Sequence, residues 1–300
     1  MKRSIKILLI SLAVTMVVSF GIAAIILVVS GNFNVATETI NDSKTFEPSE
    51  ISSIEVDLVS DDLNIIPTTK GDITIHFYGE VSTNVKRNIP ELVAYKTGGK
   101  LYVEVSKSPD IFIGLNIRRT TVDIYIPQIM LEDMDINVVS GDIKIDGLQA
   151  DEIVVDSTSG DMKLDKISSE KIRIESTSGD VVVREYKGDI DVSNTSGDVS
   201  LISGTENEDI FVKSVSGDIL IEQEGISDID IRVTSGDVRI SLPRGSEFKL
   251  DASTLSGEIE YDFELKIESS SRRNLEGYIG DSAYRIIVNT TSGDITVGYQ

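Results

Sequence analysis

Residues 157–162 read Ser-Thr-Ser-Gly-Asp-Met, and residues 176–181 read Ser-Thr-Ser-Gly-Asp-Val. The triplet Ser-Gly-Asp occurs seven times in the 300 residues, and Ser-Gly-Glu follows the same pattern once. Consecutive glycines of these triplets are 19, 19, 18, 20, 19, 21 and 36 residues apart, the last interval being close to two periods. Repetition at such a period is typical of solenoid folds. The eight turn glycines are Gly141, Gly160, Gly179, Gly197, Gly217, Gly236, Gly257 and Gly293.

Each triplet lies between two short apolar segments. Counted from each glycine, the residues seven and five before it and two and four after it are apolar in all eight units. In the second unit they are Ile153, Val155, Met162 and Leu164. A spacing of two is the period of a β-strand, whose successive side chains point to opposite faces. Polar residues such as Lys144 lie between them, so each unit predicts strand, turn, strand, turn with one face in water.

Stacking these units predicts an all-β fold, a parallel β-solenoid with coils of about 19 residues. Neighbouring rungs are then about 4.8 Å apart, and their aliphatic residues form one continuous core. The glycine and its polar neighbours suit the tight turn, because glycine reaches positive φ and Ser and Asp bond turn amides. We interpret the long interval from Gly257 to Gly293 as an enlarged loop or widened coil before the final rung.

The first 30 residues differ from the rest of the chain. Residues 7–29 carry no charge and are almost entirely Ile, Leu, Val, Ala and Met, which is long enough to cross a membrane. Lys2, Arg3 and Lys6 precede them, so the positive-inside rule places the N-terminus in the cytoplasm. Residues 1–30 are therefore predicted to be a cytoplasmic tip and single-pass anchor in the cell membrane, with an extracytoplasmic C-terminal domain. A cleaved signal peptide is the alternative, although its apolar core is usually only about 7 to 15 residues.

The charge and cysteine content exclude several classes of partner and site. The formal net charge is −22, and all 50 acidic residues follow residue 30. Such a domain repels polyanions, so nucleic acid is not expected as a partner. The chain has no cysteine, which excludes disulfides, thiolate metal sites and a lipid-modified N-terminal cysteine. Its stability must come from stacking.

Three segments follow the predicted anchor. Residues 31–50 are a polar spacer, residues 51–130 an N-terminal β cap, and residues 131–300 the Ser-Gly-Asp repeat solenoid. The cap begins with a degenerate first rung in which Asp61 stands in the place of glycine, and residues 70–75 are expected to supply the next half coil. A hairpin is predicted for 92–105 around Gly98-Gly99, and a strand for 121–127.

The repeated Thr-Ser-Gly-Asp, as in residues 158–161 and 195–198, is joined by Ile126-Pro127 before the first repeat and by Thr-Ser-Gly-Asp-Ile at 291–295. With these features the sequence resembles a bacterial family of adhesin candidates of unknown function, related to the membrane-anchored LiaG-like proteins. The resemblance covers about residues 50–298. It implies a β-solenoid at the cell envelope, sometimes beside stress-response or transport components, and brings no catalytic residues to this chain.

The acidic position of the triplet is the sharpest candidate site. In-register stacking brings these carboxylates about 5 Å apart along one edge, where like charges repel. One interpretation is a calcium ladder, because calcium takes six to eight oxygen ligands. The favoured interpretation needs no cofactor: each side chain caps its own turn. The residues are Asp142, Asp161, Asp180, Asp198, Asp218, Asp237, Glu258 and Asp294.

Other polar residues have structural interpretations as well. A column three residues before the glycines is expected to close the core with mutual hydrogen bonds rather than to bind a ligand. His76, the only histidine, is expected at the surface or in a cap. Arg272 and Arg273 form either a solvated loop, which is favoured, or a contact for an anionic partner. The column contains Ser157, Ser176, Asn194, Ser214, Thr254 and Thr290.

The sequence predicts a protein without catalytic activity. It has no Gly-x-Ser-x-Gly elbow, His-Glu-x-x-His helix or phosphate-binding loop, and the loops are short and repetitive. The leading hypothesis is a membrane-anchored extracytoplasmic β-solenoid that acts as an adhesin-like binding module for an envelope or surface partner. The alternative is an accessory regulatory or sensor subunit of an envelope stress-response system.

Overall fold

The computed structural model describes residue 16 and residues 37–82, 89–106, 118–204, 208–281 and 284–300. Apart from Met16, which is helical, and one 3-10 turn, Pro48–Glu50, the regular structure in these segments is β-strand. The predicted anchor, residues 1–30, lies outside the described residues except for Met16. Within the described segments, no helix has the length and apolar character needed to cross a membrane.

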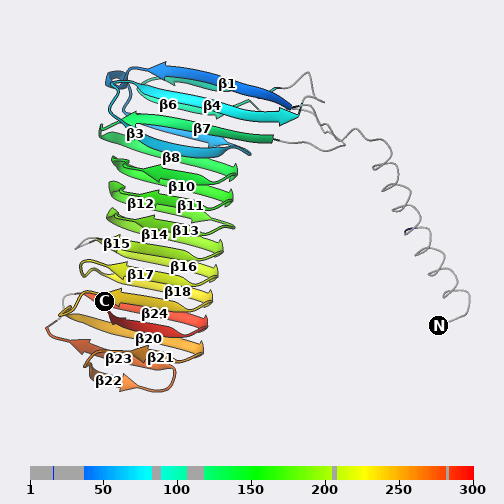
Figure 1. The fold of residues 1–300 in the computed structure, drawn as a ribbon. Helices are drawn as coiled ribbons and strands as arrows, with labels where there is room; N and C mark the ends of the chain where they lie inside the picture. The colour runs from blue at the N-terminus through cyan, green and yellow to red at the C-terminus, as the bar shows by residue number, and fades with distance from the viewer. Residues whose placement is uncertain (1–15, 17–36, 83–88, 107–117, 205–207, 282–283) are drawn as a thin grey trace, which may run out of the picture.

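The strands form two large sheets (Figure 1). Sheet A has the spatial order β1 (Thr37–Phe46), β4 (Ile73–Ser82), β7 (Arg118–Pro127), β3 (Asp62–Thr68), β9 (Ile143–Asp146), β11 (Met162–Asp165), β13 (Val181–Arg184), β15 (Val199–Gly204), β17 (Ile219–Gln223), β19 (Val238–Leu242), β25 (Ile295–Tyr299) and β21 (Ile259–Tyr261). Sheet B has the order β22 (Lys266–Ser270), β23 (Asn274–Ile279), β20 (Phe248–Ser256), β24 (Arg285–Ser292), β18 (Ile229–Ser235), β16 (Ile210–Ser216), β14 (Lys187–Ser196), β12 (Ser168–Ser176), β10 (Ala150–Ser159), β8 (Leu131–Ser140), β2 (Ser53–Leu58), β6 (Lys100–Val105) and β5 (Leu92–Thr97).

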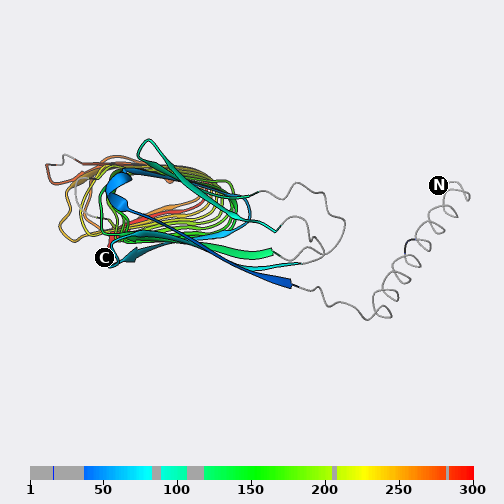
Figure 2. The same ribbon diagram turned by 90° about the horizontal axis from the view of Figure 1, so that it is seen from above.

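Each repeat contributes one strand to each sheet, which confirms the predicted all-β, parallel stacking. The strand before the Ser-Gly-Asp turn enters sheet B and the strand after it enters sheet A, as with β10 and β11. Equivalent residues face each other, for example Ile153 and Ile172 in β10 and β12. Seen down the stack, the rungs superimpose as one flattened coil (Figure 2).

The predicted aliphatic positions form the core between the sheets. All of them are buried except two in β21: Ile259 is half-buried and Tyr261 is 39% exposed. Strand β21 is the last of sheet A, so no further rung covers its residues. The two exceptions therefore mark the end of the stack rather than a failure of the pattern.

The N-terminal cap joins the stack through the degenerate rung. Strands β2 and β3 lie in register with the first repeat, and Leu63 faces Ile143. The hairpin over 92–105 is confirmed as β5 and β6, and the strand over 121–127 is part of β7. The predicted half coil at 70–75 was wrong, because β4 runs antiparallel to both β1 and β7 and so belongs to the cap. The predicted polar spacer over 31–50 was also wrong from residue 37 on, because β1 pairs with β4 as the edge strand of sheet A.

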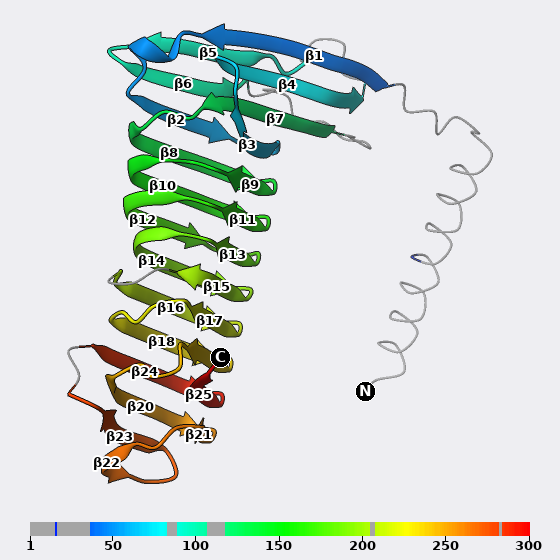
Figure 3. The ribbon, with the colours of Figure 1, turned by 60° about the vertical axis from the view of Figure 1, so that its left-hand side comes forward.

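The C-terminal rungs are out of chain order. Strands β24 and β25 lie between the rung of β18 and β19 and the rung of β20 and β21 (Figure 3). The expected loop or widened coil before a final rung was therefore wrong. The Gly257 unit is the terminal rung, and the Gly293 unit is inserted between it and the Gly236 unit. The intervening β22 and β23 extend sheet B beyond β20 with antiparallel pairing.

Candidate functional site

The turns of the repeats stack along one edge of the solenoid. At Gly160, φ is +126°, and an added Cβ would lie 2.1 Å from the carbonyl oxygen of Gly141 in the neighbouring rung. The other predicted turn glycines approach the rung next to them in the same way. Only a residue without a side chain allows this packing, which aligns the Ser, Gly and Asp columns as a ridge.

The acidic column of the ridge is a hydrogen-bonded ladder. The backbone amide of each acidic residue donates to Oδ1 of the aspartate in the neighbouring rung, at 2.8 to 3.1 Å, beginning with Asp142 to Asp62. The predicted capping role is thus modified: each carboxylate caps the next rung's turn, not its own. This bond uses one oxygen of each aspartate and ties neighbouring rungs together.

The calcium ladder stays a prediction. Among the residues that the structure describes, no group of three or more histidine, aspartate or glutamate side chains is placed to hold a metal ion. At the C-terminal end of the ridge, Arg272 Nη2 donates to Glu258 Oε1 at 2.7 Å. The Arg272 side chain is 81% exposed, so this late loop neutralises the last carboxylate of the ladder while remaining solvated.

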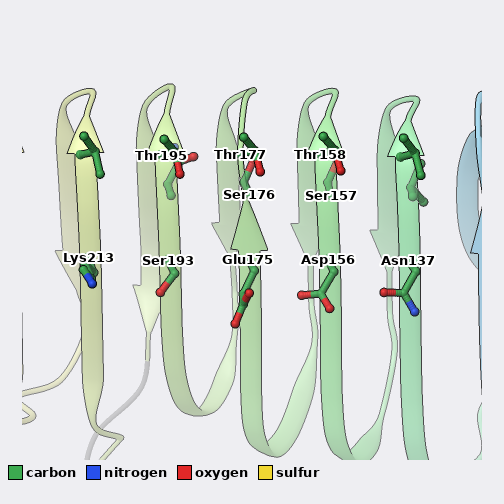
Figure 4. A pocket seen from close by; sticks show the side chains of 14 residues that line it. Asn137, Asp156, Ser157, Thr158, Glu175, Ser176, Thr177, Ser193, Thr195 and Lys213 are labelled. Carbon is green, nitrogen blue, oxygen red and sulfur yellow. The ribbon is translucent and has the colours of Figure 1, made fainter.

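A groove of about 510 Å³ crosses five rungs on the outer face of sheet B, beside the ridge. We call it the rung groove. Figure 4 shows its two rows, one standing further from the turn and one next to it. The first row is in register from strand to strand. This first row consists of Asn137, Asp156, Glu175, Ser193 and Lys213. The second row, next to the turn, consists of Val139, Thr158, Thr177, Thr195 and Val215.

The centre of the rung groove holds two adjacent carboxylates. Asp156 and Glu175 are directly paired across β10 and β12, where like charges repel. Burial, followed by the charges of Glu175 and Asp135, raises the pKa of the Asp156 carboxyl, and Arg173 offsets part of this. Oδ1 of Asp156 is buried and has no hydrogen-bond partner among the described residues. The groove therefore contains a half-buried carboxyl group with one unsatisfied oxygen.

The column of small polar residues three positions before the glycines is buried, as expected. Its bonds are not mutual, however. Asn194 Nδ2 donates to Gly197 O at 2.7 Å, and Thr254 Oγ1 donates to Gly293 O at 3.1 Å. The hydroxyls of Ser157 and Ser176 have no partner in the described part of the chain. Ser157, Ser176 and Asn194 also line the rung groove.

Sequence reasoning did not single out the carboxylate row of the rung groove. Asp156 and Glu175 each lie four residues before a turn glycine, and the outward positions of the repeat vary from unit to unit. The available signal was two acidic residues at the same repeat position in consecutive units. His76, by contrast, lies in the cap, where its Nε2 is 2.8 Å from Oδ1 of Asn41.

Comparison with solved structures finds chains that align with most of this one. An adhesin candidate from Parabacteroides merdae is 11% identical, with 85% of this chain and 95% of that chain covered and a TM-score of 0.47. An adhesin candidate from Parabacteroides distasonis is 13% identical, with 85% of this chain and 97% of that chain covered and a TM-score of 0.44. A cell-adhesion protein candidate from Clostridium sporogenes is 15% identical, with 88% of this chain and 100% of that chain covered and a TM-score of 0.30.

No curated protein matches the chain. A family model does, over residues 51–298, which span the degenerate first rung, the cap and every Ser-Gly-Asp repeat. The match begins where the described stack of rungs begins and ends within β25. The chain belongs to the Toastrack DUF4097 family.

Proposed function

We propose that this protein is a non-catalytic, single-pass membrane protein whose solenoid lies outside the cell and binds an envelope or surface partner in the rung groove. Residues 1–30 form the anchor, with the N-terminus in the cytoplasm. The partner is extended rather than compact, because the groove repeats the same positions from rung to rung across β8, β10, β12, β14 and β16.

The observation that carries this proposal is the carboxylate pair in the groove, in which one oxygen of Asp156 is unsatisfied. Asp156 and Glu175 are paired in register, and Oδ1 of Asp156 is buried without a partner among the described residues. This arrangement destabilises the folded state, because neutral or oppositely charged side chains at these two positions would not repel each other. Stable folds keep such local conflicts mainly at functional sites. The flanking hydroxyls of Thr158 and Thr177 supply further hydrogen-bonding groups at the same spacing.

A matched pair of lysine substitutions tests the groove. Thr177 lies in its second row, and Thr234 occupies the same repeat position on a rung outside it. The full-length protein in nanodiscs is sedimented with purified bacterial wall sacculi and with intact cells. We expect Thr177→Lys to reduce binding at least tenfold and Thr234→Lys to leave it within about twofold of wild type.

Equal binding by both variants, or no binding by the wild type, contradicts the proposal. If Thr177→Lys leaves wall binding intact but abolishes an envelope stress response in cells, the accessory regulatory role is favoured instead. Topology has its own test: protease added to intact cells should digest the solenoid and leave the cytoplasmic tip. Protection of the solenoid contradicts the proposed orientation.

A further inference from the structure

A second pocket, of about 630 Å³, lies on the outer face of sheet A at the cap end of the stack. It is formed where β1, β4 and β7 (top of Figure 1) meet the turn that follows β3. Its size is within the range of small-ligand sites, about 300 to 1,000 Å³. It is on the opposite sheet from the rung groove and shares no residue with it.

One wall of this cap pocket is an oriented histidine. Nε2 of His76 is 2.8 Å from Oδ1 of Asn41, and this contact fixes the orientation of the imidazole. The imidazole also stacks on Tyr78, with ring centroids 4.7 Å apart and planes 25° from parallel. The ring is therefore held by Asn41 on the neighbouring strand β1 and by Tyr78 on its own strand β4.

Tyr125 is held by a buried carboxylate behind it. Its hydroxyl donates to Oδ2 of Asp123 at 3.3 Å, while Asn64 Nδ2 donates to Oδ1 at 2.7 Å. Asp123 is only 7% exposed. Burial and the charge of Asp123 raise the pKa of Tyr125, so the phenol stays protonated. Supporting contacts of this kind, on strands rather than loops, are what a preorganised binding site requires.

The chemistry of the pocket favours a neutral, hydroxyl-rich ligand. Lys70 and Asp72 contribute one charge of each sign, so a multiply charged ligand gains little. The formal charge of −22 on the whole chain disfavours anions further. The rings of His76 and Tyr125 offer apolar surface with a polar edge, and Asn41, Lys70 and Asp72 offer donors and acceptors.

From this combination we propose that the cap pocket binds a saccharide, with a pyranose ring against Tyr125 and His76 and its hydroxyls bonded to Asn41, Lys70 and Asp72. Aromatic faces match the C–H side of a sugar ring, and paired donors and acceptors match its hydroxyls. The site is independent of the rung groove, so it stands whether or not that groove binds an envelope partner.

The test uses the full-length protein in detergent micelles and saturation-transfer difference NMR. The neutral probes are glucose, N-acetylglucosamine and the N-acetylglucosamine tetramer, and inorganic phosphate is the anionic probe. We expect saturable binding of a neutral probe that weakens at least tenfold in Asp72→Ala and in Tyr125→Ala. Tyr95→Ala should bind as wild type, because Tyr95 is an exposed cap tyrosine stacked on Tyr102 in sheet B.

Asp72 is exposed, so its truncation tests the pocket without threatening the fold. The proposal is overturned if no neutral probe saturates, if Asp72→Ala binds as wild type, or if phosphate displaces the sugar. Sugar binding lost in Thr177→Lys but kept in Asp72→Ala places the saccharide in the rung groove and also overturns it. Failure of wall binding with intact sugar binding removes the proposed groove function alone.

Discussion

The backbone amide of Asp294 donates a hydrogen bond to Oδ1 of Asp237 at 2.8 Å, although 57 residues separate the two in sequence. Glu258 lies between them in the chain, yet its amide donates to Oδ1 of Asp294, also at 2.8 Å. The ladder thus runs from Asp237 to Asp294 to Glu258. The last strands of the chain occupy an interior rung, and an earlier unit forms the end.

This rung order predicts unequal effects of two substitutions. Val297 and Tyr261 face each other in β25 and β21 at the same repeat position. Because Val297 is fully buried, Val297→Ala should lower the free energy of unfolding by about 2 kcal/mol. Tyr261→Ala should cost less than about 1 kcal/mol, since its side chain is at the edge. Urea unfolding measures both, and the reverse ranking would support stacking in chain order.

A buried ion pair joins the cap to the first rung. Asp61, fully buried, accepts two bonds of 2.7 Å from Arg118 and one from the hydroxyl of Thr120. Arg118→Met leaves the carboxylate unpaired and should cost about 3 to 5 kcal/mol. Arg232→Met, which breaks the exposed pair with Asp230, is the control and should change stability little. A cost for Arg118→Met no larger than that of the control refutes the role of this pair.

Turn glycines should not tolerate a methyl group. At Gly160 the positive φ disfavours a side chain, and an added Cβ would lie only 2.1 Å from the carbonyl oxygen of Gly141. Gly160→Ala should therefore lower the free energy of unfolding by at least about 2 kcal/mol. Gly71 has open space around its Cβ position, and Gly71→Ala should be close to neutral. Thermal unfolding of both variants checks this, and a Tm for Gly160→Ala equal to that of Gly71→Ala contradicts the packing of the ridge.

The raised pKa of Asp156 makes its contribution to stability depend on pH. The folded state holds this proton more tightly than the unfolded state, so ionisation costs stability as pH rises through the folded pKa. Asp156→Asn should therefore raise Tm at pH 7, and the gain should vanish as pH falls to about 4, the unfolded value. The same variant should weaken partner binding in the groove. Asp151→Asn, on the exposed part of β10, serves as control.

The acidic ladder yields a prediction about calcium. One oxygen of each aspartate already accepts a backbone amide, so few remain to meet a requirement for six to eight oxygens. We expect no saturable heat in calorimetric titration and an unchanged Tm at millimolar calcium. A saturable signal that disappears in Asp180→Asn would instead establish the calcium ladder along the ridge.

Much of the fold could be predicted because one pattern recurs. The period, the turn glycine and the aliphatic spacing are local properties, and they place Ile153 or Val181 in the core without knowledge of their neighbours. Even Asp61, in a degenerate unit, was assigned to the position that it occupies beside Gly141. Local periodicity is a reliable guide wherever each unit stacks on the one before it.

The order of the last rungs could not be predicted from the same pattern. The Gly257 and Gly293 units present equivalent apolar and turn residues, so both fit against the Gly236 unit. What differs is Leu275 and its neighbours in β23, which occupy the far edge of β20. The rung groove escaped prediction for another reason: it depends on outward side chains from five units, and Asp156 gains its properties only when Glu175 lies beside it.

The inserted C-terminal rung has a consequence for biogenesis. Synthesis delivers the chain from its N-terminus, so the slot between the β18–β19 and β20–β21 rungs is filled only after β24 and β25 have been made. A product that ends before β24 would keep unpaired strand edges, which recruit other chains or attract degradation. The synthesis of β24 and β25 is thus a condition for closing the stack.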